Sequence, residues 1–299
     1  AGVLFSNMLP RTRNGKELAL GRLFLRELNR EQFTLSRTSS RRRKGDMQMS
    51  EYVVELKNAT KRFPGVVALK NMQLSVKPGE ILGLIGENGA GKSTIMNILT
   101  GYLAATEGQV TVAGHPLPEE ADAAKACVGY LPEQPPLYPE MTVQEYLTFA
   151  AELKGVKKAE RKEQVCRAAR RTGLEAVLPR LIRSLSKGYK QRVGIAQALL
   201  GSPRLIILDE PMVGLDPAQV IEIRKLIREL GRAHTVILSS HILSEVQAVC
   251  QQILILSKGH LAAAGSLEEL TADGKSLEEV FLELTDGEPE EATGEEEAE

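Results

Sequence analysis

Short apolar runs, each ending in a polar or glycine-rich segment, recur along the central part of the chain. Three of these runs occupy residues 80–85, 205–208 and 235–238. Brief apolar stretches of this kind are typical of strands that are buried on both faces of a parallel sheet. A further strand-like run, 52–56, precedes them. The hydrophobic pattern therefore predicts a sheet whose strands are spread over most of the chain.

Between the apolar runs, the pattern changes to helical spacing. The clearest helix is predicted at 218–230, where apolar residues recur after Asp216 and Pro217, which suit the N-cap and the first turn. Other helices are expected at 92–100, at 143–153, within 157–171 and from the segment 185–192 to Leu200. Strands that alternate with helices in this way predict an α/β protein.

Charge is distributed unevenly, although the formal net charge is only −1. Residues 1–46 contain 11 Lys and Arg against 4 Asp and Glu, whereas 286–299 contain 8 acids and no Lys or Arg. The neutral stretch between them is long enough to bury a large core. We expect a basic, disordered extension over 1–48, a domain over 49–285, and an acidic, disordered tail over 286–299.

The basic extension has two interpretations. Met47 and Met49 immediately precede the first strand-like run, so that 1–46 can be sequence upstream of a natural start. Alternatively, the Arg-Arg-Arg-Lys cluster at 41–44 indicates a targeting arm or an arm that binds an anionic surface. Residues 18–28 have the pattern of a short helix.

The composition argues against several classes of protein. No apolar run approaches the roughly 18 residues of a membrane-spanning helix, so a membrane process would require another chain. The three cysteines form no C-x-x-C pair, which disfavours a disulfide framework and a zinc site and fits a reducing compartment. Near-neutral charge and the absence of Trp argue against nucleic acid as the main partner.

A glycine-rich motif follows the apolar run at 80–85. Residues 86–94 match G-x-x-x-x-G-K-[ST], in which glycines bring backbone N–H groups close to phosphate and the following helix presents its positive end. Lys92 can reach the β- and γ-phosphates, and Ser93 can ligate Mg²⁺. The predicted nucleotide-binding residues of the loop are Gly86, Glu87, Asn88, Gly89, Ala90, Gly91, Lys92, Ser93 and Thr94.

Polar groups follow the other two buried runs. Asp209 and Glu210 come directly after 205–208, and Ser239-Ser240-His241 come at the end of 235–238. Side chains at the carboxyl ends of parallel strands face the ligand crevice of an open α/β sheet. We therefore assign Asp209 to Mg²⁺, Glu210 to polarising the attacking water, and His241 to the γ-phosphate.

Together these motifs resemble the nucleotide-binding domain of ATP-binding cassette (ABC) transporters. The segment Leu185-Ser186-Lys187-Gly188-Tyr189 is similar to the family's signature, which is usually Leu-Ser-Gly-Gly-Gln. The likeness covers 51–285. It implies ATP as the nucleotide and a P-loop NTPase core with a parallel sheet, an antiparallel β subdomain and an inserted α-helical subdomain at about 141–200.

The resemblance assigns further residues to the nucleotide. Phe63 matches the aromatic residue that stacks on adenine, and Asp216 matches the acid of the loop that crosses the dimer interface. Ser186 and Gly188 match the signature positions that contact the γ-phosphate bound to a second subunit. Two subunits, identical or different, would then sandwich two ATP molecules and drive a separate transmembrane permease from the cytoplasmic face of the membrane.

The sequence departs from the family pattern in two places. In the signature, Lys187 stands where a glycine is usual, and Tyr189 stands where Gln is usual. In the loop that normally presents a Gln to Mg²⁺ and the permease, the matching position is Glu133, with Gln134 one place later. These departures and the segment 276–285 resemble the branch of the family that serves ABC-2-type exporters.

Two other functions compete with that of a transport ATPase. A soluble ABC ATPase that acts on ribosomes or DNA is disfavoured because there is one cassette, no long coiled-coil insertion and no basic stripe in 47–285. A nucleotide switch that hydrolyses ATP weakly is suggested by Lys187 and Glu133. The intact Lys92, Asp209, Glu210 and His241 argue against it.

Overall fold

The computed structural model describes residues 51–286. The helix expected at 18–28, the basic extension and, apart from Asp286, the acidic tail lie outside the described residues.

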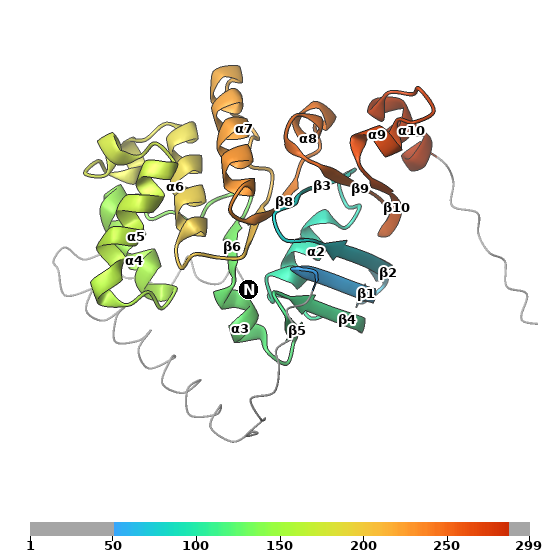
Figure 1. The fold of residues 1–299 in the computed structure, drawn as a ribbon, viewed down its shortest axis with the longest axis horizontal. Coiled ribbons are helices and arrows are strands. Elements are labelled where there is room, and N and C mark those ends of the chain that lie inside the picture. Colours follow the sequence, from blue (N-terminus) through green and yellow to red (C-terminus); the bar gives the residue numbers. More distant parts are fainter. Residues whose placement is uncertain (1–50, 287–299) are drawn as a thin grey trace, which may run out of the picture. The chain divides into compact units, whose positions relative to one another are not determined.

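A six-stranded sheet carries the site, with the strand order β10-β9-β3-β8-β7-β6 (Figure 1). From β9 to β6 the neighbouring strands are parallel, and β10 returns antiparallel to β9. The strands are β3 (Ile81–Gly86), β6 (Val128–Leu131), β7 (Leu205–Leu208), β8 (Thr235–Ser239), β9 (Gln252–Ser257) and β10 (His260–Gly265). The three apolar runs are thus adjacent strands, and the predicted parallel sheet is confirmed.

A second, four-stranded sheet is antiparallel and has the order β2-β1-β4-β5. Its strands are β1 (Val54–Phe63), β2 (Val66–Val76), β4 (Glu107–Val112) and β5 (His115–Leu117). The run at 52–56 therefore leads into β1, which extends to Phe63. This sheet is the antiparallel β subdomain that the family resemblance implied.

The core consists of two apolar clusters on opposite faces of the six-stranded sheet. Alternation along β3 sends Ile81 and Ile85 into one cluster and Leu82 and Leu84 into the other. All six residues of β3 are buried. Because such a strand meets protein on both faces, its sequence is continuously apolar rather than alternating.

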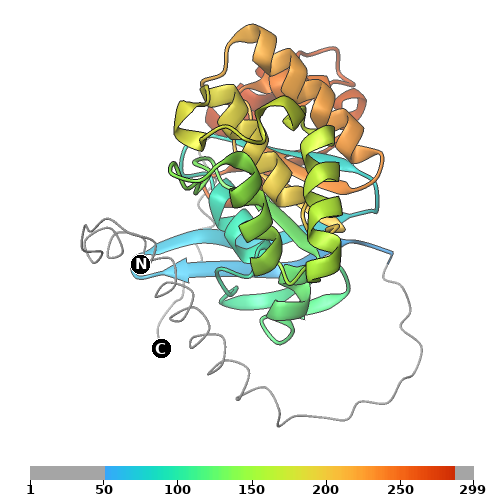
Figure 2. The ribbon, with the colours of Figure 1, turned by 90° about the vertical axis from the view of Figure 1, so that its left-hand side faces the viewer.

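Helices α4, α5 and α6 pack against one another beside the β6 end of the sheet (Figures 1 and 2). The α-helices are α2 (Lys92–Leu99), α3 (Ala121–Ala126), α4 (Val143–Leu153), α5 (Lys158–Arg171), α6 (Lys187–Leu199), α7 (Pro217–Gly231), α8 (Leu243–Val249), α9 (Leu267–Leu270) and α10 (Leu277–Asp286). Short 3-10 helices lie at η1 (Glu175–Val177) and η2 (Ile182–Ser184). The helices predicted within 51–286 all form, with ends that differ by one residue or so.

Helix α4 shows how local sequence sets these boundaries. Thr142 and Glu145 form a capping box, in which each side chain accepts from the other residue's backbone N–H.

Among residues 51–286, none of the helices has both the length and the apolar character that crossing a membrane requires.

Candidate nucleotide site

The phosphate loop connects the end of β3 at Gly86 to the start of α2 at Lys92. Gly89 and Gly91 have φ angles of 86° and 108°, a region that favours glycine. At Gly91 a Cβ would also lie 2.6 Å from Cδ2 of Leu69. No acidic residue occupies the first turn of α2, so its positive end is left uncompensated. The loop therefore has the backbone and the electrostatics of an anion site.

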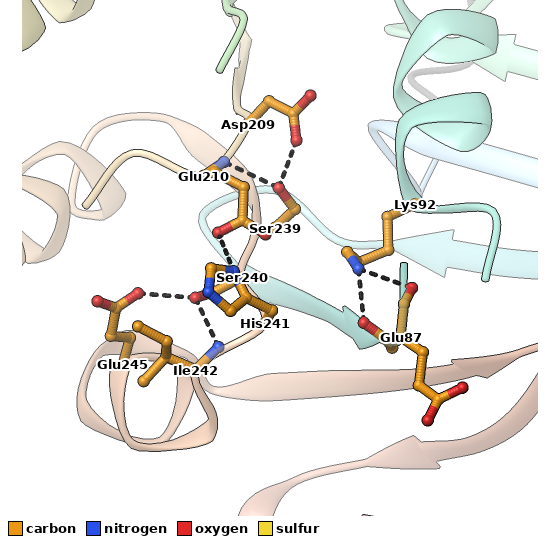
Figure 3. A network of polar contacts seen from close by, with 10 residues as sticks. Glu87, Lys92, Asp209, Glu210, Ser239, Ser240, His241, Ile242 and Glu245 are labelled. Atoms are coloured by element: carbon orange, nitrogen blue, oxygen red, sulfur yellow. Dashed lines mark hydrogen bonds and ion pairs between the residues drawn. The ribbon is translucent and has the colours of Figure 1, made fainter. Parts of the chain in front are cut away.

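Lys92 is only 8% exposed and reaches back over the loop (Figure 3). Its Nζ donates hydrogen bonds to the carbonyl oxygens of Gly86 at 2.5 Å and Glu87 at 3.1 Å. Burial lowers the pKa of Lys92, while the charges of Glu210 and Asp209 act in the opposite direction. The structure thus brings the predicted cation and the two predicted acids into one electrostatic environment.

Asp209 follows β7, and the pairing of Leu208 with Leu238 of β8 places it beside Ser239. Ser239 Oγ donates to Asp209 Oδ1 at 2.6 Å. Burial raises the pKa of Asp209, and the charge of Glu133 raises it further, whereas the Ser239 hydrogen bond and Lys92 lower it. Glu133, from the loop after β6, is therefore close enough to Asp209 for the two carboxylates to interact.

Glu210 and His241 face each other across the ends of β7 and β8 (Figure 3). His241 Nδ1 lies 2.9 Å from Glu210 Oε2, and the Glu210 N–H donates to Ser239 Oγ at 2.9 Å. The Glu210 side chain is largely buried, while that of His241 is half exposed. Glu210 also has a positive φ of 47°, which is strained for a residue other than glycine.

Behind His241 lies a buried pair, Ser240 and Glu245. Ser240 Oγ donates to Glu245 Oε2 at 2.7 Å and accepts from the Ile242 N–H at 3.1 Å. Both Ser240 and Glu245 are buried, although Glu245 is a carboxylate. The backbone on each side of His241 is therefore tied to the first turn of α8.

The residues present fit a nucleotide with Mg²⁺. Ser93 is exposed at the start of α2, and Asp209 and Glu133 add carboxylates nearby, which are the oxygen ligands that Mg²⁺ prefers. Phe63 is the last residue of β1 and is 41% exposed. Nζ of Lys61 lies 5.1 Å from the centroid of the Phe63 ring. An aromatic ring of this exposure leaves a face available for a base.

The signature residues occupy a different part of the structure, where α6 meets α7. Ser186 caps α6, and Asp216 caps α7 by accepting from the Gln219 N–H at 3.0 Å. A Cβ on Gly188 would lie 2.6 Å from the Gln219 amide carbon. Within the described residues, the contacts of Ser186, Gly188 and Asp216 are with these two helices. Their part in a nucleotide site remains a prediction.

Sequence reasoning missed three residues of this constellation, Ser239, Ser240 and Glu245. Ser239 and Ser240 were noted only as the end of a strand, and Glu245 was not singled out. Two adjacent hydroxyl residues at the carboxyl end of an otherwise apolar strand were the available signal for the two serines. Nothing local marks Glu245 as buried, because acids in the first turn of a helix are ordinarily exposed.

Comparison with known proteins gives three likenesses. The family model described as "ABC transporter" matches residues 69–213. An uncharacterised ABC transporter ATP-binding protein of Bacillus subtilis, YxlF, is 36% identical over 218 residues, which are 73% of this chain and 72% of the relative. The structure of cbiO1 from Clostridium perfringens, part of the ABC transporter complex cbiONQ, matches with a TM-score of 0.70 and 28% identity, covering 78% of this chain and 96% of that one.

A dimeric structure of a bacterial ABC transporter cassette also matches, with a TM-score of 0.65 and 28% identity over 71% of this chain and 98% of that one. A second structure of the same cassette shows a dimer in a post-hydrolysis state, bound to ADP and Pi. Those ligands and that dimer belong to the neighbour.

Proposed function

Because this chain belongs to the family of ABC transporter ATP-binding proteins, we propose that it binds and hydrolyses ATP to power transport through a separate membrane-spanning permease. The observation that carries the proposal is the convergence of Lys92, Asp209, Glu210 and His241 at the carboxyl ends of β3, β7 and β8. The same edge of the sheet bears the phosphate loop, so charge-bearing groups and an anion cradle share one site.

Hydrolysis in this site depends on positioning and charge neutralisation. The phosphate loop and Lys92 hold the triphosphate, and Phe63 stacks on adenine. Glu210 polarises the attacking water, while His241, held through Nδ1 on Glu210, presents its other ring nitrogen to the γ-phosphate. Bound Mg²⁺, held by Ser93, Asp209 and Glu133, would neutralise charge on the β- and γ-phosphates.

A second cassette completes the site. In this proposal Ser186 and Gly188 of one subunit approach the γ-phosphate on the other, and Asp216 lies at the interface. The start of α6 suits this role because its first turn contains no acid and its N-terminal N–H groups attract anions. The dimeric solved neighbour supports the arrangement. The second subunit can be another copy of this chain or a different cassette.

The permease contact is proposed on the helical subdomain, about 141–200, within a domain of 49–285. A cavity of about 570 Å³ adjoins this subdomain: Lys154 at the end of α4 lines it, together with the end of α2 and with β6. Such a contact would place the chain at the cytoplasmic face of a membrane, and the ABC-2-like departures favour an exporter.

Substitution of Glu210 tests the proposal. We expect the wild-type chain to hydrolyse ATP with Mg²⁺, and Glu210→Gln to lose at least about a hundredfold in turnover, because the amide cannot polarise water. Nucleotide binding should persist, and the variant should accumulate as an ATP-bound dimer in size-exclusion chromatography. Glu229→Gln, an exposed substitution on α7, serves as the matched control. Normal turnover in Glu210→Gln would refute the role of this base, and a wild-type chain without ATPase activity would refute the function.

A further inference from the structure

Two adjacent serines at the end of β8 connect to opposite sides of the hydrolytic site. We propose that Ser239 and Ser240 are separate positioning residues: Ser239 holds Asp209 and Glu210, whereas Ser240, through the buried carboxylate of Glu245, holds His241. The inference rests on the proposed function, since it concerns how the same site is kept in place.

Ser239 acts on the acids through a single hydroxyl. Its hydrogen is donated to Asp209 Oδ1 at 2.6 Å, and its oxygen accepts from the Glu210 N–H at 2.9 Å. Ser239 is completely buried, so water cannot replace either bond. The second bond also secures the peptide of Glu210, whose positive φ needs support from its surroundings. Removing this hydroxyl would therefore loosen the metal-binding acid and the base together.

Ser240 makes its hydrogen bonds away from Asp209 and Glu210. Its hydroxyl donates to Glu245 and accepts from the Ile242 N–H, so that the residues on both sides of His241 are fixed. Glu245 is only 5% exposed, and a buried carboxylate is retained only where hydrogen bonds satisfy it. The His241 ring itself is half exposed and bonds to Glu210. The backbone that carries this ring is held by Ser240 and Glu245, so its place depends on their support as well as on Glu210.

The separate roles of Ser239 and Ser240 predict two different kinetic defects. Loss of the Ser239 hydroxyl should weaken the response to Mg²⁺, because Asp209 loses the bond that orients its carboxylate. Loss of the Ser240–Glu245 bond should lower turnover without changing the response to Mg²⁺, because the acids keep their own support from Ser239. In the Ser240 and Glu245 variants KM for ATP should change little, since neither the phosphate loop nor the acids lose a contact.

The test uses the full chain with Ser239→Ala, Ser239→Cys, Ser240→Ala and Glu245→Gln. Ser239→Cys leaves a group in the position of the hydroxyl but one that hydrogen-bonds only weakly, so it replaces Ser239→Ala if that variant does not fold. Ser244→Ala, an exposed substitution on α8, is the matched control. The measurements are kcat, KM for ATP, the half-saturating Mg²⁺ concentration, and the Kd of ATP with and without Mg²⁺, which needs no turnover.

We expect the Ser239 variants to lose roughly ten- to a hundredfold in kcat, as for a hydrogen bond to a charged group, and to lose much of the Mg²⁺-dependent gain in ATP affinity. Ser240→Ala and Glu245→Gln should lose roughly tenfold in kcat with wild-type Mg²⁺ dependence. The inference is overturned if folded Ser239 variants keep wild-type Mg²⁺ dependence, or if all four variants behave like Ser244→Ala. Those results, with an active wild-type chain, leave the proposed function intact. An inactive wild-type chain instead refutes the function itself.

Discussion

Lys92 shows how a single residue gains its chemistry from its surroundings. A lysine ammonium is rarely buried unless it has partners, and here two loop carbonyls and two nearby acids provide them. The amine is thus kept at the phosphate loop rather than in solvent. In the same way, Asp209 and Glu210 are useful because Ser239 and His241 restrict them. At this scale, function depends on hydrogen-bond partners more than on residue type.

Replacing Lys92 should mainly affect nucleotide binding. Lys92→Ala removes charge-assisted contacts to phosphate, each worth about 1.5–3 kcal/mol, so we expect ATP affinity to fall by roughly ten- to a hundredfold. Fluorescence titration with a labelled ATP analogue measures this directly. Lys77→Ala, an exposed substitution before the opposite end of β3, is the control and should leave affinity unchanged. Unchanged affinity in Lys92→Ala would contradict the assignment of the loop.

Among the helices and strands, the contact between α6 and β6 is unusually close. A Cβ on Gly129 of β6 would lie 2.0 Å from the carbonyl oxygen of Ala198 in α6. A Cβ on Gly194 of α6 would meet the Leu131 side chain at 2.4 Å. Glycine on both elements therefore lets the helix that begins after Ser186 lie directly on the strand that leads to Glu133.

A methyl group at this contact should destabilise the fold. In Gly129→Ala the obstacle is helix backbone, which cannot rotate away, so we expect a loss of about 1–3 kcal/mol in the free energy of unfolding. Urea denaturation followed by circular dichroism measures it. Gly265→Ala is the matched control, because the nearest atoms to its Cβ belong to side chains rather than to backbone, the closest being Glu269 Oε2 at 3.0 Å. Equal stability of the two variants would show that α6 is not held this closely.

For the whole molecule, the main consequence of the proposed function is that a complete nucleotide site would need two chains. The phosphate loop, Asp209, Glu210 and His241 form one group, whereas Ser186, Gly188 and Asp216 form another at the junction of α6 and α7. A head-to-tail pair of cassettes would place the first group of each chain against the second group of its partner. Transport could then be driven by closure, because ATP would bind the closed pair better than the open one.

Two inactive variants should therefore rescue each other. Lys92→Ala damages the phosphate loop, and Ser186→Asp keeps a good N-cap but places a negative charge where the γ-phosphate would approach. Each variant alone should be inactive. If subunits exchange freely in an equal mixture, half of the dimers contain one chain of each variant. Each such dimer has one intact site out of two. We therefore expect about a quarter of wild-type turnover.

ATPase activity of the mixture, compared with each variant alone, measures this rescue. A mixture of Lys92→Ala with Glu210→Gln is the control, since both defects lie in the same group and no intact site can form. Absence of rescue in the first mixture, with subunit exchange shown by labelled chains, would contradict the shared site.

The sequence by itself determined the features that depend on neighbouring residues. The strand, the glycines and the helix of the phosphate loop are contiguous, and so is Asp209-Glu210 after its apolar run. Helix ends at Asp216 and Thr142 were likewise set by local hydrogen bonds, and the Asp216 cap was predicted. Family resemblance added the antiparallel sheet and the inserted helices, which hydrophobic periodicity alone would not have arranged.

Tertiary structure alone decided which polar groups meet. The Ser239–Asp209 bond joins residues 30 apart, and it exists because β7 and β8 are neighbours in a particular register. A shift of one residue would turn these side chains to the opposite faces of the sheet. The proximity of Glu133 to Asp209 and the burial of Glu245 also arise from packing between distant segments. Sequence therefore specified which chemical groups were available, and strand register and packing determined which of them act together.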